Sequence, residues 1–165
     1  MATRSVLVIS LICTVTQLAF AEVPTGCVVL INAHASNYLN RAELVNQQLR
    51  RVVAGIDPSQ VWTIVKRDHQ YRIKVRGCVN ELFASSGQQV DPERRNLYVW
   101  EPAREEATGG AWDIQELSGG KYLIRSVEFD EFLFFSTVTR NVQTYTPKSI
   151  APKDDPKFQW YILPC

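Results

Sequence analysis

Histidines and carboxylates are the side chains that could carry acid–base catalysis or bind a metal ion. The chain has two histidines, His34 and His69, both in expected hairpin turns, and neither has a nucleophile motif beside it. Glu128, Asp130 and Glu131 lie close in sequence, but neighbouring residues of a strand or turn point in different directions, which predicts a hydrophilic hairpin tip. We therefore expect no enzyme activity, no metal site and no cofactor.

One short segment carries the side chains best suited to hold a sugar. Alternation along residues 96–100 would bury Leu97 and Val99 and leave Asn96, Tyr98 and Trp100 on the outer face of a strand. An aromatic face can stack on a sugar ring, and an amide can fix its hydroxyls. The segment predicts a carbohydrate site; the alternative is that these aromatic residues are strand formers half-covered by a neighbouring loop.

The residues after this strand offer a different chemistry. In the segment 101–105, Pro102 would stiffen the backbone and Arg104 could enter a trypsin-like primary pocket. The glutamates on either side of Arg104 would oppose docking on an acidic pocket. Protease inhibition through this loop is therefore the alternative to ligand binding.

The first residues predict export from the cell. A short basic start at residues 1–4 precedes an apolar run that ends in a small-x-small pattern at Ala21. This is the layout of a secretory signal peptide, and the run is short for a membrane-spanning helix. We expect residues 1–21 to be removed and residues 22–165 to form one soluble extracellular domain.

Export places the cysteines in an oxidising setting, where thiols tend to pair. Cys27, Cys78 and Cys165 remain once the predicted signal peptide is removed. Three is an odd number, so at least one thiol is left over and arithmetic alone does not say which.

A sequence repeat organises the rest of the chain. Trp62, Trp112 and Trp160 stand 50 and 48 residues apart, and each is followed two positions later by isoleucine. Each unit also opens with two apolar residues nine positions apart, namely Leu30 and Leu39, Ile73 and Leu82, and Ile124 and Leu133. Self-similarity at this period indicates three structural units, at approximately 27–64, 65–114 and 115–165.

Within each unit, alternating apolar residues predict short strands separated by glycine- and proline-containing turns. The stretch from Ala42 to Arg51 differs, because Leu44, Val45 and Leu49 have helical spacing. Two interpretations stay open there: a helical turn elaborating a loop, or a polar strand pair.

Three units of about four short strands, each with a tryptophan near its last strand, resemble the β-trefoil. The resemblance implies an all-β fold in which Trp62, Trp112 and Trp160 point into a shared core. It is supported by an independent argument, since one unit alone cannot bury its apolar face while three units can cover one another.

The β-trefoil resemblance also implies a disulfide. In that fold the first and last strands are neighbours, so Cys27 and Cys165 would come within disulfide distance. Cys78 would then remain as a free thiol, with an intermolecular bridge and a covalent dimer as the alternative.

Individual motifs resemble different branches of the fold. Gln60-Val61-Trp62 matches the Gln-x-Trp signature of ricin-type lectins, whereas the second and third units depart from it. The overall spacing is similar to the trefoil of insect low-molecular-mass haemolymph lipoproteins. The loop with Pro102 and Arg104 resembles that of Kunitz-type trefoil inhibitors.

The charge distribution excludes some classes of binding partner. With 18 basic and 17 acidic side chains and no basic run, the chain lacks the footprint of a nucleic-acid or heparin binder. We therefore expect a secreted, non-catalytic binding module, lectin-like or carrier-like, with a glycan or extracellular protein held on its loops or outer barrel face. A proteinase inhibitor is the alternative.

Overall fold

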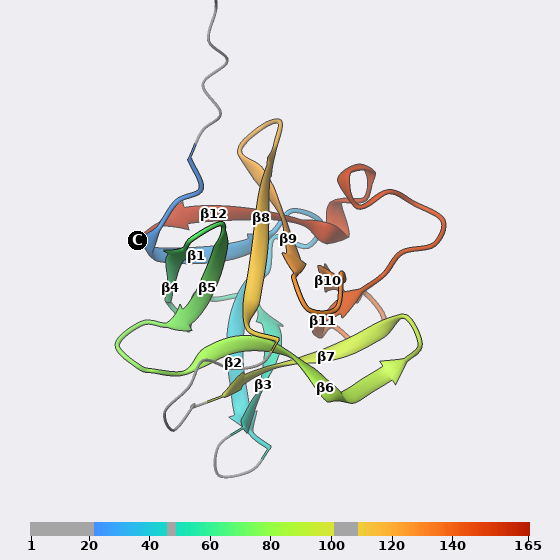
Figure 1. Cartoon of the computed structure of the whole chain (residues 1–165), viewed down its shortest axis with the longest axis horizontal. Coiled ribbons are helices and arrows are strands. Elements are labelled where there is room, and N and C mark those ends of the chain that lie inside the picture. The colour runs from blue at the N-terminus through green and yellow to red at the C-terminus, as the bar shows by residue number, and fades with distance from the viewer. Residues whose placement is uncertain (1–21, 46–48, 101–108) are drawn as a thin grey trace, which may run out of the picture.

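The protein is a twelve-stranded all-β structure, seen in a computed structural model that describes residues 22–45, 49–100 and 109–165 (Figure 1). In the described part of the chain, no helix has the length and apolar character that crossing a membrane requires. The elements are β1 (Gly26–Asn32), β2 (Tyr38–Leu44), β3 (Leu49–Gly55), β4 (Trp62–Arg67), β5 (Gln70–Val75), β6 (Glu81–Asp91), β7 (Arg94–Trp100), β8 (Ala111–Leu117), β9 (Lys121–Ser126), β10 (Phe132–Phe135), β11 (Val142–Tyr145), the 3-10 helices η1 (Pro152–Asp154) and η2 (Pro156–Phe158), and β12 (Gln159–Pro164).

Six strands close into a barrel. Antiparallel pairing runs from β1 to β4, β5, β8, β9 and β12, and β12 pairs back with β1. The three tryptophans occupy corresponding registers in this ring, where Trp62 faces Val28, Trp112 faces Tyr71 and Trp160 faces Tyr122. Closure leaves no unpaired sheet edge in the barrel.

The other six strands form three hairpins, β2–β3, β6–β7 and β10–β11. The hairpins pair with one another through β3–β7 and β7–β11, and a bridge between Val53 and Asn141 joins the first to the third. A closed six-stranded barrel with three mutually paired hairpins is the β-trefoil architecture, so the predicted fold class is confirmed.

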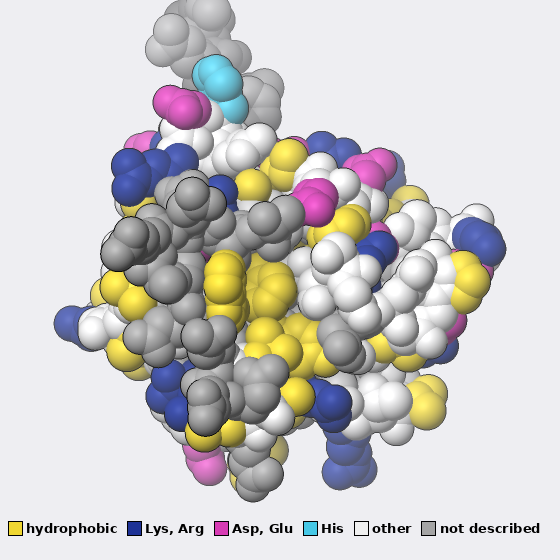
Figure 2. Space-filling model, turned by 60° about the horizontal axis from the view of Figure 1, so that its bottom comes forward, with side chains coloured by type: hydrophobic (Ala, Val, Ile, Leu, Met, Phe, Trp, Pro, Cys, Tyr) yellow, Lys and Arg dark blue, Asp and Glu magenta, His cyan; other side chains and the backbone are white. Residues whose placement is uncertain are grey.

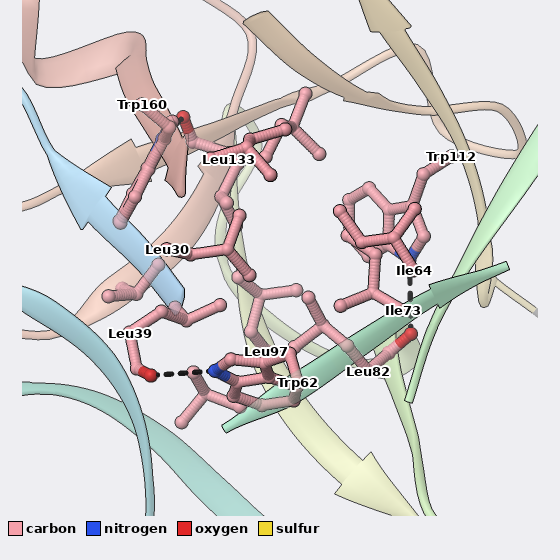
Figure 3. Packing of buried hydrophobic residues seen from close by; sticks show 14 of the residues in the cluster. Leu30, Leu39, Trp62, Ile64, Ile73, Leu82, Leu97, Trp112, Leu133 and Trp160 are labelled. Carbon is pink, nitrogen blue, oxygen red and sulfur yellow. Dashed lines mark hydrogen bonds between the residues drawn. The ribbon is translucent and has the colours of Figure 1, made fainter. Parts of the chain in front are cut away.

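The core repeats the three-fold pattern of the sequence. Trp62, Trp112 and Trp160 are completely buried, and each indole Nε1–H donates to a leucine carbonyl, at 2.8 Å to Leu39, 3.1 Å to Leu82 and 3.1 Å to Leu133 (Figure 3). Three further sets of equivalent buried residues surround them: Leu30, Ile73 and Ile124; Leu39, Leu82 and Leu133; Val52, Leu97 and Val142. The periodic residues are therefore the packed interior.

The described residues between Ala42 and Arg51 lie on a strand pair rather than in a helical turn, and residues 46–48 lie outside the described residues. They contribute to β2 and β3, which pair from Tyr38 with Gly55 to Leu44 with Arg50. Leu44 and Val45 are exposed at the end of β2. Tertiary pairing with the β6–β7 hairpin through β3 decides the conformation here.

The predicted disulfide is confirmed. Cys27 and Cys165 are bonded, with their Cα atoms 5.5 Å apart. The β1–β12 pairing places them together, since Val28 is in register with Pro164 and the Cys165 N–H donates to the Cys27 carbonyl at 3.2 Å.

Cys78 lies exposed and unbonded in the turn after β5. We expect the secreted protein to run as a monomer on a non-reducing gel, because Cys27 and Cys165 bond to each other and an exposed thiol does not by itself hold a second chain beside it. A Cys78→Ser variant should migrate identically. A band at twice the monomer mass that disappears in Cys78→Ser would instead establish the covalent dimer.

Candidate ligand-binding groove

The outer-face site expected at Asn96, Tyr98 and Trp100 does not form as a single surface. Tyr98 is only 1% exposed, and its ring packs 6.1 Å from the ring of Phe83. The expected alternation does not expose Tyr98, because the Phe83 side chain from the directly opposite position on β6 packs against its ring. The expectation that Tyr98 offers its ring to a ligand is therefore wrong.

The other two residues of that set are half-buried and lie apart. Asn96 accepts a hydrogen bond from Gln143 Nε2 at 3.4 Å, whereas Trp100 lies beside Phe83 in a hollow of 280 Å³ with Leu49. Figure 2 shows hydrophobic side chains gathered in the middle of the molecular face that carries the β2–β3 and β6–β7 hairpins. Pro102 and Arg104, the predicted inhibitory residues, lie outside the described residues.

The acidic cluster near residue 130 is not a simple hydrophilic tip. Glu131 is 4% exposed, pairs with Arg95 at 3.2 Å and accepts a hydrogen bond from the Thr144 hydroxyl at 2.5 Å. The Arg95 guanidinium also lies 3.8 Å above the ring of Phe129. This buried ion pair joins the second unit to the third and fixes the β6–β7 and β10–β11 hairpins against each other.

Between these two hairpins lies a groove that offers both aromatic and charged side chains. We call it the aromatic groove; it has a volume of 540 Å³, and the lining residues used below are Asp91, Glu93, Arg94, Phe134, Tyr145 and Phe158. The volume falls within the range typical of small-molecule sites.

Three aromatic rings make the apolar wall of the aromatic groove. The rings of Tyr145 and Phe158 stack with their centroids 5.7 Å apart and 16° between their planes. The centroid of the Phe134 ring lies 4.8 Å from that of Phe158 and 5.2 Å from that of Tyr145. Phe158 is fully buried, whereas Phe134 and Tyr145 are half-buried. Phe158 thus supports the two rings that keep surface for a ligand.

Strand pairing brings these residues together. Tyr145 of β11 is in register with Arg94 of β7, and the Thr146 N–H donates to the Glu93 carbonyl at 2.9 Å. Phe158 comes from η2, where the Asp155 side chain caps the helix by accepting from the Lys157 N–H at 3.0 Å. The groove is therefore built from segments more than fifty residues apart in the chain.

The charged wall begins at the tip of the β6–β7 hairpin. Asp91 Oδ1 accepts from the Glu93 N–H at 2.9 Å, which shapes the turn, and Asp91 Oδ2 accepts from Arg94 Nε at 2.7 Å and from Nη2 at 2.5 Å. The hydrogen bond from Arg94 lowers the pKa of the Asp91 carboxyl below its usual value, and that bond raises the pKa of Arg94. Both groups stay ionised at neutral pH.

Glu93 joins the charged wall to the aromatic wall. Its carboxylate pairs with Lys148 and accepts a hydrogen bond from the Tyr145 hydroxyl at 3.4 Å. Burial, together with the negative charge of Glu93, raises the pKa of Tyr145 above its usual value. The phenol therefore keeps its proton at neutral pH and can both donate and accept hydrogen bonds.

A second hollow, of 570 Å³, lies on the barrel wall and is lined in part by Lys66, His69 and Arg125. Arg125 is held by Asp113 at 2.7 Å and by Asp130 at 2.7 Å. In the described ranges, no three His, Cys, Asp or Glu side chains come together as a metal site would require.

The sequence pattern does not indicate the aromatic groove. Asp91-Pro92 and the prolines at 147, 152 and 156 predict turns and no ligand site. The available clue was the number of aromatic and charged residues in these turns, but their meeting depends on how the hairpins pair.

Similarity to known proteins is found by comparing three-dimensional structures. The sequence matches no protein-family model and no curated protein sequence. A designed three-fold symmetric protein, ThreeFoil, superposes with a TM-score of 0.67 at 17% identity, covering 85% of this chain and 99% of that one. The Polyporus squamosus lectin, solved with Neu5Acα2-6Galβ1-4GlcNAc, superposes with a TM-score of 0.63 at 15% identity over 86% of this chain and 50% of that one. These likenesses concern the fold.

A closer likeness is found in a mosquito. A salivary protein of Culex quinquefasciatus, described as a member of the Cysteine and Tryptophan-Rich (CWRC) family, is 30% identical and superposes with a TM-score of 0.74 over 90% of this chain and 100% of that one. Identity at this level across the whole of that protein shows common family membership as well as a common fold. The chain thus belongs to the Cysteine and Tryptophan-Rich family.

Proposed function

We propose that the protein is a secreted, non-catalytic glycan-binding module whose ligand lies in the aromatic groove. The observation that carries this proposal is the half-buried Tyr145, stacked on Phe158 at 5.7 Å beside the Asp91–Arg94 pair in a groove of 540 Å³. Sugars have apolar C–H faces and many hydroxyls, and a site needs an aromatic surface for the first and planar polar groups for the second. The groove supplies both.

Secretion is supported from two sides. A disulfide such as Cys27–Cys165 forms in an oxidising compartment, and the Culex relative is described as salivary. The predicted signal peptide, residues 1–21, lies outside the described residues.

Glycan binding is supported by a lectin with the same fold, which was solved with a glycan bound.

Replacing Tyr145 by alanine is expected to weaken glycan binding by about tenfold or more. The substitution removes the ring on which a sugar would stack, and burying an aromatic surface is worth more than the roughly 1.4 kcal/mol that a tenfold change requires. Tyr145→Phe keeps the ring and should retain most of the affinity. A glycan array identifies the ligand, and titration calorimetry then measures the dissociation constants.

Tyr38→Ala is the matched control, because Tyr38 is also half-buried but lies on β2, away from the aromatic groove. Melting curves establish that every variant is folded. Equal dissociation constants for wild type and Tyr145→Ala would show that the glycan binds outside the aromatic groove. If wild type bound no glycan but inhibited trypsin stoichiometrically, with inhibition lost in Arg104→Ala, the inhibitor alternative would replace the proposal.

A further inference from the structure

The charges around the aromatic groove are arranged in pairs. Arg94 is held by Asp91, Lys148 by Glu93 and Lys157 by Asp155. Pro92, Ser149 and Ile150 lie among the remaining lining residues and carry no charge. Each of these three cations, all in the described part of the chain, is therefore matched by a carboxylate.

Arg94 is the cation best able to recognise an acidic ligand, since a guanidinium binds a carboxylate through two parallel N–H groups. In this structure its Nε and Nη2 already donate to Asp91 Oδ2, at 2.7 and 2.5 Å. The side chains of both residues are about one-third exposed, so the pair sits at the groove surface. An incoming carboxylate could reach only the remaining edge of Arg94, whose positive charge Asp91 already balances, and it would face the carboxylates of Glu93 and Asp155.

From this pairing we infer that the groove selects neutral glycan termini and rejects termini that carry a carboxylate or sulfate. The inference rests on the proposed glycan-binding function and names its ligand class. A neutral sugar hydroxyl can accept from the free edge of Arg94 and donate to the outer lone pairs of Asp91 or Glu93 without breaking either ion pair. Among the described residues that line the groove, an anionic terminus finds each cation already paired and meets repulsion from the carboxylates, which is how sites exclude the wrong partner.

The substitution that tests the inference is Asp91→Asn. Asparagine keeps the Oδ1 acceptor for the Glu93 N–H and therefore the hairpin turn, while it removes the negative charge that occupies Arg94. Asp130→Asn is the matched control: it removes the charge from another arginine–aspartate pair, Arg125–Asp130 at 2.7 Å, which lies outside the aromatic groove. Both variants change the net charge equally.

The measurement compares each neutral glycan bound on an array with its sialylated or sulfated counterpart, for example Galβ1-4GlcNAc with Neu5Acα2-6Galβ1-4GlcNAc. We expect wild type to prefer the neutral member at least tenfold, Asp91→Asn to reduce or reverse this ratio at least tenfold, and Asp130→Asn to keep it. A wild-type preference for acidic termini, an unchanged ratio in Asp91→Asn or an equal change in both variants would overturn the inference and leave glycan binding intact. Folded wild type that bound no glycan would overturn the proposed function, and the inference with it.

Discussion

Replacing Cys27 and Cys165 together by alanine is expected to lower the free energy of unfolding by about 4 kcal/mol. The bridge spans a sequence separation of 138 residues and so closes nearly all of the described chain into one loop. In the chain-entropy model, the constraint that a cross-link places on the unfolded chain grows with loop length and reaches about 4 to 5 kcal/mol for loops above 100 residues. The bond also fastens β1 to β12, where the barrel closes.

Urea denaturation of the double variant measures this loss, with reduced wild type as a second route to the same state. Both cysteines are replaced because a single substitution would leave a thiol free to pair with the exposed Cys78. Cys78→Ala alone is the control and should leave the midpoint unchanged. A double variant as stable as wild type would show that strand pairing alone holds the barrel closed.

Trp112→Ala is expected to cost about 3 to 5 kcal/mol, because it leaves a large cavity in a fully packed core. It also removes the indole donor to the Leu82 carbonyl, a buried acceptor that would lose this partner. Such a loss is a large fraction of the 5 to 15 kcal/mol that stabilises a typical domain, so the variant should melt far below wild type.

Trp100→Ala is the control for that experiment, since Trp100 is half-buried at the end of β7 and packs against Phe83 rather than into the barrel. We expect it to be clearly less destabilising. Trp112→Phe isolates the hydrogen bond, because it keeps an aromatic ring and removes the donor. An unchanged melting temperature for Trp112→Ala would refute the equivalence of the three units.

The sequence alone established the fold because its signal is local and repeated three times. The spacing of Trp62, Trp112 and Trp160 marks the same place in each unit, and the barrel buries all three identically. Once the repeat suggested a β-trefoil, the adjacency of Cys27 and Cys165 followed from closure, since the first and last strands must pair.

Tertiary structure decided which surfaces remain available to a ligand. Alternation correctly placed Leu97 and Val99 inside, but it could not report that the β6–β7 pairing would cover Tyr98 as well. The same limitation applies to the ends of β2 and β3 at Ala42–Leu44 and Leu49–Arg51, where pairing with a distant strand outweighed the helical spacing. Coverage of an outer face depends on neighbours that no local pattern encodes.

The aromatic groove shows most clearly the difference between what the sequence predicts and what the tertiary structure determines. The sequence places Tyr145, Arg94 and Phe158 in or next to turn-rich segments. The β7–β11 register and the position of η2 bring them to one groove. Core positions are determined by apolar periodicity, which a sequence displays directly because burial repeats along each strand. A ligand site on the hairpins is determined by contacts between units, which exist only after the three units have closed around their common core.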